Sequence, residues 1–193
     1  MNKILFGLLI SLSIACSNDN SKPAITSALP EGGEFTAYDQ VPGLSHAVYY
    51  GQGELIAEEG DVLDGKQHGT WISYFPTGKI KTVTSYLNGK KQGPQIEFEN
   101  SGYVVSKSPY VNGYLEGEFR SYNKGVIAER KTYKNGELHG VVQKYYKDGT
   151  IMEESNYENG LIHGEAKWYD QKGQLTIKYT YEKGQLVEDT SDE

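Results

Sequence analysis

The chain has 193 residues and a formal net charge of −7, with glycine (23 residues) and tyrosine (16 residues) both abundant. An acidic surface repels phosphate backbones and anionic lipid headgroups, which argues against nucleic acid as a partner and against membrane binding by the surface itself. Many glycines and few aliphatic side chains favour turns and half-buried strands over a thick hydrophobic core.

The first fifteen residues have the pattern of a secretory signal peptide. Lys3 supplies a positive charge, residues 4–14 are mostly apolar, and Ala15 precedes Cys16. Cys16 is the only cysteine, so no internal disulfide can form, and the segment resembles a bacterial lipoprotein signal in which this cysteine is lipidated. We therefore expect an exported protein of the bacterial cell envelope with a lipid anchor at Cys16. An ordinary cleaved signal and an uncleaved anchor are the alternatives, although the apolar run is short for a bilayer span.

The next segment, residues 16–44, carries Ser, Asn, Asp, Pro and Gly with few large apolar side chains. Such a composition buries too little surface to offset the entropy lost on folding, so we interpret it as the lipidated cysteine followed by a flexible tether. The domain that follows is predicted at residues 45–187. The acidic residues 188–193 are expected to form a disordered tail.

A motif of about 24 residues recurs five times from Gly65 onward, which indicates an array of repeated units. Each copy contains a second glycine four residues after the first, an aromatic residue, a third glycine, an aliphatic residue and a closing tyrosine. The second glycines are Gly69, Gly93, Gly117, Gly140 and Gly164. The aromatic residues are Tyr74, Phe98, Tyr122, Tyr145 and Tyr169, and the closing tyrosines are Tyr86, Tyr110, Tyr133, Tyr157 and Tyr181.

Each copy contains two strand-like runs separated by short turns. Asn88-Gly89 and its equivalents predict tight hairpin turns, because both residues tolerate positive φ. A second turn, Thr77-Gly78 in the first copy, separates the two runs, and no stretch has a helical apolar period. The sequence therefore predicts an all-β fold, an elongated single-layer twisted sheet of tandem antiparallel β-hairpins. A degraded copy from His46 is expected to cap its N-terminal end.

Alternation along the strands predicts which side chains share a face of the sheet. We expect Ile80, Thr84 and Tyr86 to lie on one face, together with the first-strand aromatic Tyr74, so that rings form ladders along the array. The other face then carries side chains that the repeat does not dictate, and these are our candidate partner-binding residues: Trp71, Phe75, Phe119, Tyr146 and Trp168.

The repeat frame, Gly-x-x-x-Gly-x-aromatic-x-x-Tyr-x-x-x-Gly-x-aliphatic ending in Tyr-x-Asn-Gly, resembles the bacterial variant of the MORN (membrane occupation and recognition nexus) repeat. The likeness is close from Gly65 through Gly184 and loose over residues 46–64. The resemblance implies an array of β-hairpins that binds partners and has no catalytic residues of its own. Bacterial proteins of this type are frequently assigned as antitoxins or immunity proteins paired with a toxin.

Histidines and adjacent acidic residues are the candidates for a metal site or a catalytic site. Three histidines occupy one repeat position just before the second glycine, where the other copies have Gln92 and Glu116; they are His68, His139 and His163. Equivalent positions lie about 10 Å apart when two strands separate them, which is too far for a shared metal ion. We expect this position to stabilise the turn. Adjacent acids such as Glu153 and Glu154 point to opposite faces, so they do not form a catalytic pair.

The sequence thus predicts a protein that is not an enzyme and uses no cofactor or metal. Its sheet would bind another protein, with a toxin as one candidate, and no nucleic acid. The alternative is an envelope glycan- or peptidoglycan-binding module in which Trp71, Phe75, Tyr146 and Trp168 stack on sugar rings. An exported hydrolase has the least support, because the sequence shows no arrangement of nucleophile and base.

Overall fold

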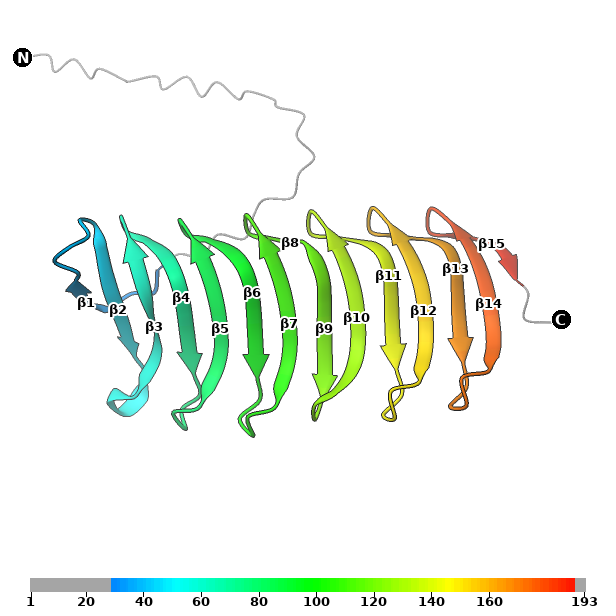
Figure 1. Ribbon diagram of the computed structural model, residues 1–193, viewed down its shortest axis with the longest axis horizontal. Coiled ribbons are helices and arrows are strands. Elements are labelled where there is room, and N and C mark those ends of the chain that lie inside the picture. The colour runs from blue at the N-terminus through cyan, green and yellow to red at the C-terminus, as the bar shows by residue number, and fades with distance from the viewer. Residues whose placement is uncertain (1–28, 190–193) are drawn as a thin grey trace, which may run out of the picture.

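The computed structural model describes residues 29–189. These residues form a single antiparallel sheet of fifteen strands that is not closed, and neighbours in the sheet are neighbours in the chain (Figure 1). The short strand β8 is an exception, since it pairs only with β7 at the side of the main path. The fold is therefore the predicted row of hairpins.

Successive strands are seven to nine residues long in most of the sheet. They are β1 (Glu34–Ala37), β2 (Leu44–Tyr50), β3 (Ile56–Leu63), β4 (Lys66–Tyr74), β5 (Ile80–Leu87), β6 (Lys90–Phe98), β7 (Val104–Val111), β8 (Tyr114–Leu115), β9 (Gly117–Asn123), β10 (Val126–Lys134), β11 (Glu137–Tyr145), β12 (Ile151–Glu158), β13 (Leu161–Tyr169), β14 (Leu175–Glu182) and β15 (Gln185–Asp189). A 3-10 turn, η1 (Gln52–Glu54), connects β2 to β3. The part of the chain described here contains no helix long and apolar enough to cross a membrane.

The Asn-Gly turns have the predicted conformation. Asn88 and Gly89 have φ values of 50° and 78°, as a type I′ hairpin turn requires. The turn also docks on the preceding first strand, because the Gly89 amide donates to the Gln67 carbonyl at 2.8 Å. The same hydrogen bond joins Gly113 to Lys91, Gly136 to Leu115, Gly160 to Leu138 and Gly184 to Ile162.

The residue before the second glycine supports these turns with its side chain, as predicted. Gln92 Oε1 accepts a hydrogen bond from the Asn112 amide at 2.9 Å, and Glu116 Oε2 accepts one from the Asn135 amide at 2.6 Å. His163 Nδ1 accepts from the Lys183 amide at 3.4 Å. In these three copies the position therefore ties the first strand to a turn about 20 residues later in the chain. The prediction is not met at His68 and His139, whose buried Nδ1 atoms have no hydrogen-bond partner within the described chain.

One extra residue bulges from the second strand of each copy, and this bulge decides which side chains share a face. Ser73 pairs with Thr82, but Tyr74 pairs with Ile80, so residue 81 has no partner on β4. The same register shift recurs between β6 and β7, β9 and β10, β11 and β12, and β13 and β14. Bulges bend strands, and the strands bow along their length in Figure 1.

One side of the sheet, the packed face, holds the buried side chains. Because directly paired residues share a face, Trp71 and Thr84 lie here with the closing Tyr86. The other buried residues of this face are Ala47, Tyr49, Val62, Gln67, Ser106, Ser108, Val142, Ser155 and Ala166. Small side chains between large rings give this thin sheet its core.

Trp71 is the centre of the N-terminal part of that core. Its ring lies 6.0 Å from the Tyr49 ring and 6.4 Å from the Tyr86 ring, and Nε1 donates to the Asp61 carbonyl at 2.8 Å. The ring also covers Gly60, where an added Cβ would come within 2.5 Å of ring atoms. Only glycine therefore fits beneath the tryptophan.

The opposite side, the open face, carries the first-strand aromatics. Tyr74 is an odd number of residues from Trp71 on the same strand, so the two point to opposite faces. The bulge moves Ile80 to the side of Tyr74 and away from Tyr86. Our prediction that both sets of rings share a face is therefore wrong: the closing tyrosines lie on the packed face and the first-strand aromatics on the open face.

The ends of the domain differ in part from the prediction. Strands β2 and β3 confirm the degraded N-terminal copy, but β1 pairs with β2 inside the predicted tether of residues 16–44, and Leu29 packs on the buried cluster. The predicted tether therefore extends too far toward the C-terminus, because its last part belongs to the sheet. Strand β15 reaches Asp189, two residues into the predicted tail. The predictions for the signal peptide, Cys16 and the last four residues lie outside the described residues.

Candidate binding surface

A row of aromatic and aliphatic side chains runs along the open face, where the first strand of each hairpin ends. We call this row the stripe. Its members are the pairs Tyr50 with Ile56, Tyr74 with Ile80, Phe98 with Val104, Tyr122 with Ile127, Tyr145 with Ile151, and Tyr169 with Leu175. Ile80 is 41% exposed and Leu175 is 52% exposed, and Tyr50 and Ile56 are exposed as well. The other members of the stripe are half-buried, so the stripe is partly accessible along its whole length.

A second row crosses the middle of the open face and changes character along the sheet. It begins with half-buried aliphatic residues, Ile72, Val83 and Ile96. It continues with Lys107, Arg120 and Arg130, which are paired side by side on β7, β9 and β10. The open face is therefore apolar near its N-terminal end and basic in its middle.

Glu118 holds the two arginines of the basic middle in place. It accepts a hydrogen bond from Arg130 Nη2 at 2.6 Å and another from Arg120 Nε. Partial burial raises the pKa of Glu118, but these hydrogen bonds and the nearby positive charges outweigh it, so that the pKa lies below its usual value. The guanidinium groups are thus held in fixed positions on the surface.

A cluster of hydrogen-bonded polar side chains lies at the N-terminal end of the open face. Glu59 accepts a hydrogen bond from the Tyr74 hydroxyl at 2.5 Å and lies 3.4 Å from His46 Nε2. Asp61 accepts from the Tyr38 hydroxyl at 3.0 Å and lies 3.2 Å from His46 Nδ1. The hydrogen bond to Glu59 raises the pKa of Tyr74 to about 12. The cluster joins β2, β3, β4 and the β1–β2 connection, which is a structural role.

The packed face carries one half-buried amine in its row of tyrosines. In the other copies an aliphatic residue pairs with the closing tyrosine, as Leu138 pairs with Tyr133. Lys91 takes this place beside Tyr86, with its amine 4.8 Å from the Tyr110 ring and 2.8 Å from Gln95 Oε1. Partial burial lowers the pKa of Lys91. A lysine in place of the aliphatic residue makes this position a departure from the repeat.

The structure does not gather our five candidate partner-binding residues on one accessible face. Trp71 is only 3% exposed, so it can bind neither a partner nor a sugar ring, which corrects both predictions that used it. Phe119 packs on Tyr133 and Trp168 packs on Tyr179, both on the packed face. Phe75 and Tyr146 lie at the turns beyond β4 and β11. The alternation along the first strand was predicted correctly, so Trp71 and Tyr74 do point to opposite faces. The bulge in the second strand, however, puts Thr84 on the face of Trp71 and Ile80 on the face of Tyr74.

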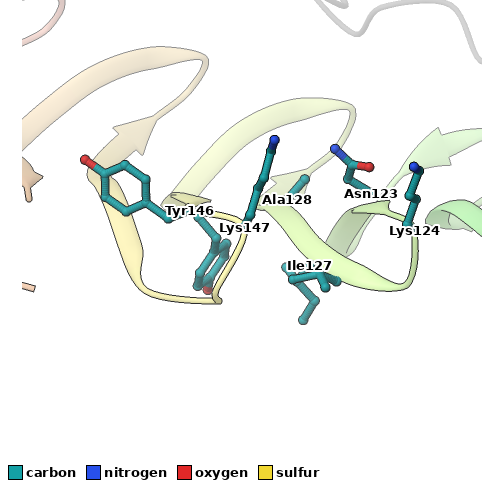
Figure 2. Close-up of a pocket in the computed structure, with 8 residues that line it drawn as sticks. Asn123, Lys124, Ile127, Ala128, Tyr146 and Lys147 are labelled. Carbon is teal, nitrogen blue, oxygen red and sulfur yellow. The ribbon is translucent and has the colours of Figure 1, made fainter. Parts of the chain in front are cut away.

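A hollow of about 580 Å³ lies between the β9–β10 turn and the end of β11 (Figure 2). Its lining is Asn123, Lys124, Val126, Ile127, Ala128, Tyr145, Tyr146 and Lys147. Figure 2 shows the side chains of Lys124, Asn123 and Lys147 extending on the same side of the hollow. Of these residues, Tyr146 was predicted as a partner-binding residue and Tyr145 as a structural position of the repeat. The sequence did contain a sign of the hollow, because the third copy of the repeat is one residue shorter than the other copies.

The stretches of the chain that match a known family coincide with hairpins of the sheet. Three stretches of the chain match the MORN repeat variant. They are residues 67–88, 138–159 and 162–188, which correspond to β4–β5, β11–β12 and β13–β15. The MORN repeats at the two ends thus enclose residues 89–137, which hold Lys91, the basic middle of the open face and most of the hollow. No curated protein matches the chain. Within residues 29–189, no three His, Cys, Asp or Glu side chains are grouped to hold a metal ion.

Proposed function

We propose that this protein is a non-enzymatic, lipid-anchored scaffold of the bacterial cell envelope that binds another protein on its open face. The observation that carries the proposal is the stripe, which places apolar side chains in the same position on six successive hairpins. Contiguous exposed apolar surface on a soluble domain marks an interaction site. The MORN repeats support a scaffold role, since repeat arrays offer long surfaces for partners.

The composition of the open face favours a protein as the partner. Aromatic residues and arginine are enriched at protein interfaces, and the open face combines tyrosines of the stripe with Arg120 and Arg130. Because Glu118 already restrains Arg120 and Arg130, these arginines would lose less side-chain entropy when a partner binds them. We expect the partner to present apolar side chains opposite the stripe and a carboxylate opposite the basic middle.

The anchor and the location rest on the sequence alone. Residues 4–14 and Ala15 precede Cys16 as in a lipoprotein signal, and the polar residues that follow would separate the domain from the membrane. A role as antitoxin or immunity protein rests on the resemblance to bacterial proteins with this repeat. In that role the open face would bind a toxin.

The test compares two leucines that are equally exposed on opposite faces. Leu175 belongs to the stripe and Leu186 pairs with Tyr181 on the packed face, and each is 52% exposed. The tagged full chain is used to capture proteins from envelope extracts of its own cells after cross-linking. We expect an Ile80→Asn, Leu175→Asn variant to lose the captured protein and a Leu186→Asn variant to retain it.

Capture of no protein by the full chain would contradict the proposal, as would equal capture by both variants. The antitoxin role has its own test, in which each captured protein is expressed with and without this chain. Growth arrest that is relieved only by the full chain and the Leu186→Asn variant is the expected result. A captured protein that is harmless to cells would remove the antitoxin role and leave the scaffold.

A further inference from the structure

The hollow beside β10 exists because the third copy is one residue short. Gly113 and Gly136 are 23 positions apart, whereas Gly89 and Gly113 are 24 apart. The missing residue comes from the turn between β9 and β10. There Lys124 and Gly125, with φ values of 49° and 87°, form a tight two-residue turn between Asn123 and Val126.

The other copies have a longer turn at this position, and the longer turns touch one another. Thr77 Oγ1 donates to Asn100 Oδ1 at 2.5 Å, and Lys79 Nζ donates to the Asn100 carbonyl at 2.9 Å. The Tyr146 hydroxyl likewise donates to the Tyr169 carbonyl at 2.8 Å. The short β9–β10 turn interrupts this row of loops and leaves the hollow next to Tyr145, Tyr146 and Lys147.

The lining of the hollow has two chemical parts. Val126, Ile127, Ala128 and the Tyr145 ring form an apolar wall. The volume of the hollow lies within the range of roughly 300–1,000 Å³ found for ligand sites. Asn123 adds a side-chain amide, which can donate to and accept from a peptide group. An apolar wall with one amide suits a segment of polypeptide.

The two lysines of the hollow have no acidic partner among residues 29–189. In contrast, Lys131, Lys144, Lys167 and Lys178 each form an ion pair with a glutamate. Most other lysines of the described chain also form no ion pair, so the distinguishing feature is that two such ammonium groups lie beside one hollow on a chain with a net charge of −7. They would attract a carboxylate from a binding partner.

We propose that the hollow binds an acidic segment of the partner polypeptide, with a carboxylate between Lys124 and Lys147 and an apolar side chain against Ile127 and Tyr145. The inference rests on the proposed function, because it takes the partner to be a protein. It assigns the contact to the copy that departs from the repeat, which is how a regular array can recognise one partner in one register.

The experiment uses two blocked peptides as probes, acetyl-Glu-Leu-Glu-Leu-amide and acetyl-Gln-Leu-Gln-Leu-amide. Each is titrated into the isotope-labelled full chain, and backbone NMR shifts are followed. We expect saturable shifts at Gly125, Ala128 and Lys147 with the acidic peptide, and binding of the neutral peptide weaker by about fivefold or more, since each exposed ion pair contributes little by itself. High salt should reduce the difference between the two peptides.

A matched variant separates the hollow from general positive charge. Lys172 occupies the same repeat position as Lys124, in a turn of full length between Asp170 and Gln174. Lys124→Gln with Lys147→Gln should weaken the acidic peptide about fivefold to tenfold, whereas Lys172→Gln should leave its affinity unchanged. Equal affinity for both peptides, shifts elsewhere on the sheet, or equal effects of the two variants would overturn the inference.

The capture experiment distinguishes the two proposals. If the full chain captures a protein and the Lys124→Gln, Lys147→Gln variant captures it equally, the hollow has no role and the scaffold function stands. If the acidic peptide binds in the hollow but no protein is ever captured, the peptide site stands and the scaffold function fails.

Discussion

Replacing Trp71 by alanine should unfold the N-terminal end of the sheet before the rest. Truncating a buried tryptophan to alanine costs about 3–5 kcal/mol. Trp71 belongs in the upper part of this range, because it is 3% exposed, contacts the rings of Tyr49 and Tyr86, and donates to the Asp61 carbonyl. We expect a loss of about 4–5 kcal/mol in the free energy of unfolding of the N-terminal copies.

Hydrogen exchange read by mass spectrometry, combined with urea unfolding, measures this loss and shows where it occurs. In a linear array each hairpin contacts only its neighbours, so protection should fall in β2–β5 and persist in β11–β14. Trp168→Ala is the control, since that ring contacts only Tyr179 among the aromatic residues of the described chain and should cost about 2 kcal/mol at the other end. A loss below about 1 kcal/mol for Trp71→Ala, or an even loss of protection along the sheet, would refute the reasoning.

Three smaller predictions concern single contacts. Glu116→Ala should cost about 1–2 kcal/mol, because the Asn135 amide loses its acceptor, and exchange should rise at this turn only; unchanged exchange there would contradict the role given to Glu116. Lys91→Leu should raise stability to urea by about 1 kcal/mol, since it restores the aliphatic partner of the tyrosine row, and a lower urea midpoint would count against this view. Tyr74→Phe should cost about 1 kcal/mol at pH 8, because the hydrogen bond to Glu59 is lost. The folded-state pKa of Tyr74 is raised to about 12, so this contribution is complete below pH 10 and lost between pH 10 and 12, where the wild-type and variant midpoints should converge.

The hairpin array could be predicted from the sequence because glycine and asparagine mark its turns. At Asn88-Gly89 the residue types alone require positive φ, and the structure has it. The turn role of Gln92, Glu116 and His163 followed in the same way from their shared place in the repeat. Features that local backbone chemistry determines were therefore accessible from one sequence.

The faces of the sheet were not accessible, because a single unpaired residue reverses the alternation. The bulge at residue 81 carries no sequence signature in one chain, yet it decides that Ile80 lies with Tyr74. The predicted contact residues inherited this error, and Trp71 proved to be core. Strand β1 was missed because Glu34–Ala37 is short and exposed, so its pairing with β2 leaves no hydrophobic pattern.

The turns that dock on an earlier strand give the array a direction. The Gly89 amide closes on Gln67 and the Gly113 amide on Lys91, so every first strand is completed by residues that come about 22 positions later. A chain that emerges with its N-terminus first can then close one hairpin at a time, each sealed by the next turn to appear. Duplication or loss of one 24-residue unit would preserve these hydrogen bonds between successive copies. The number of repeats can therefore change in evolution without any change in how neighbouring repeats contact one another.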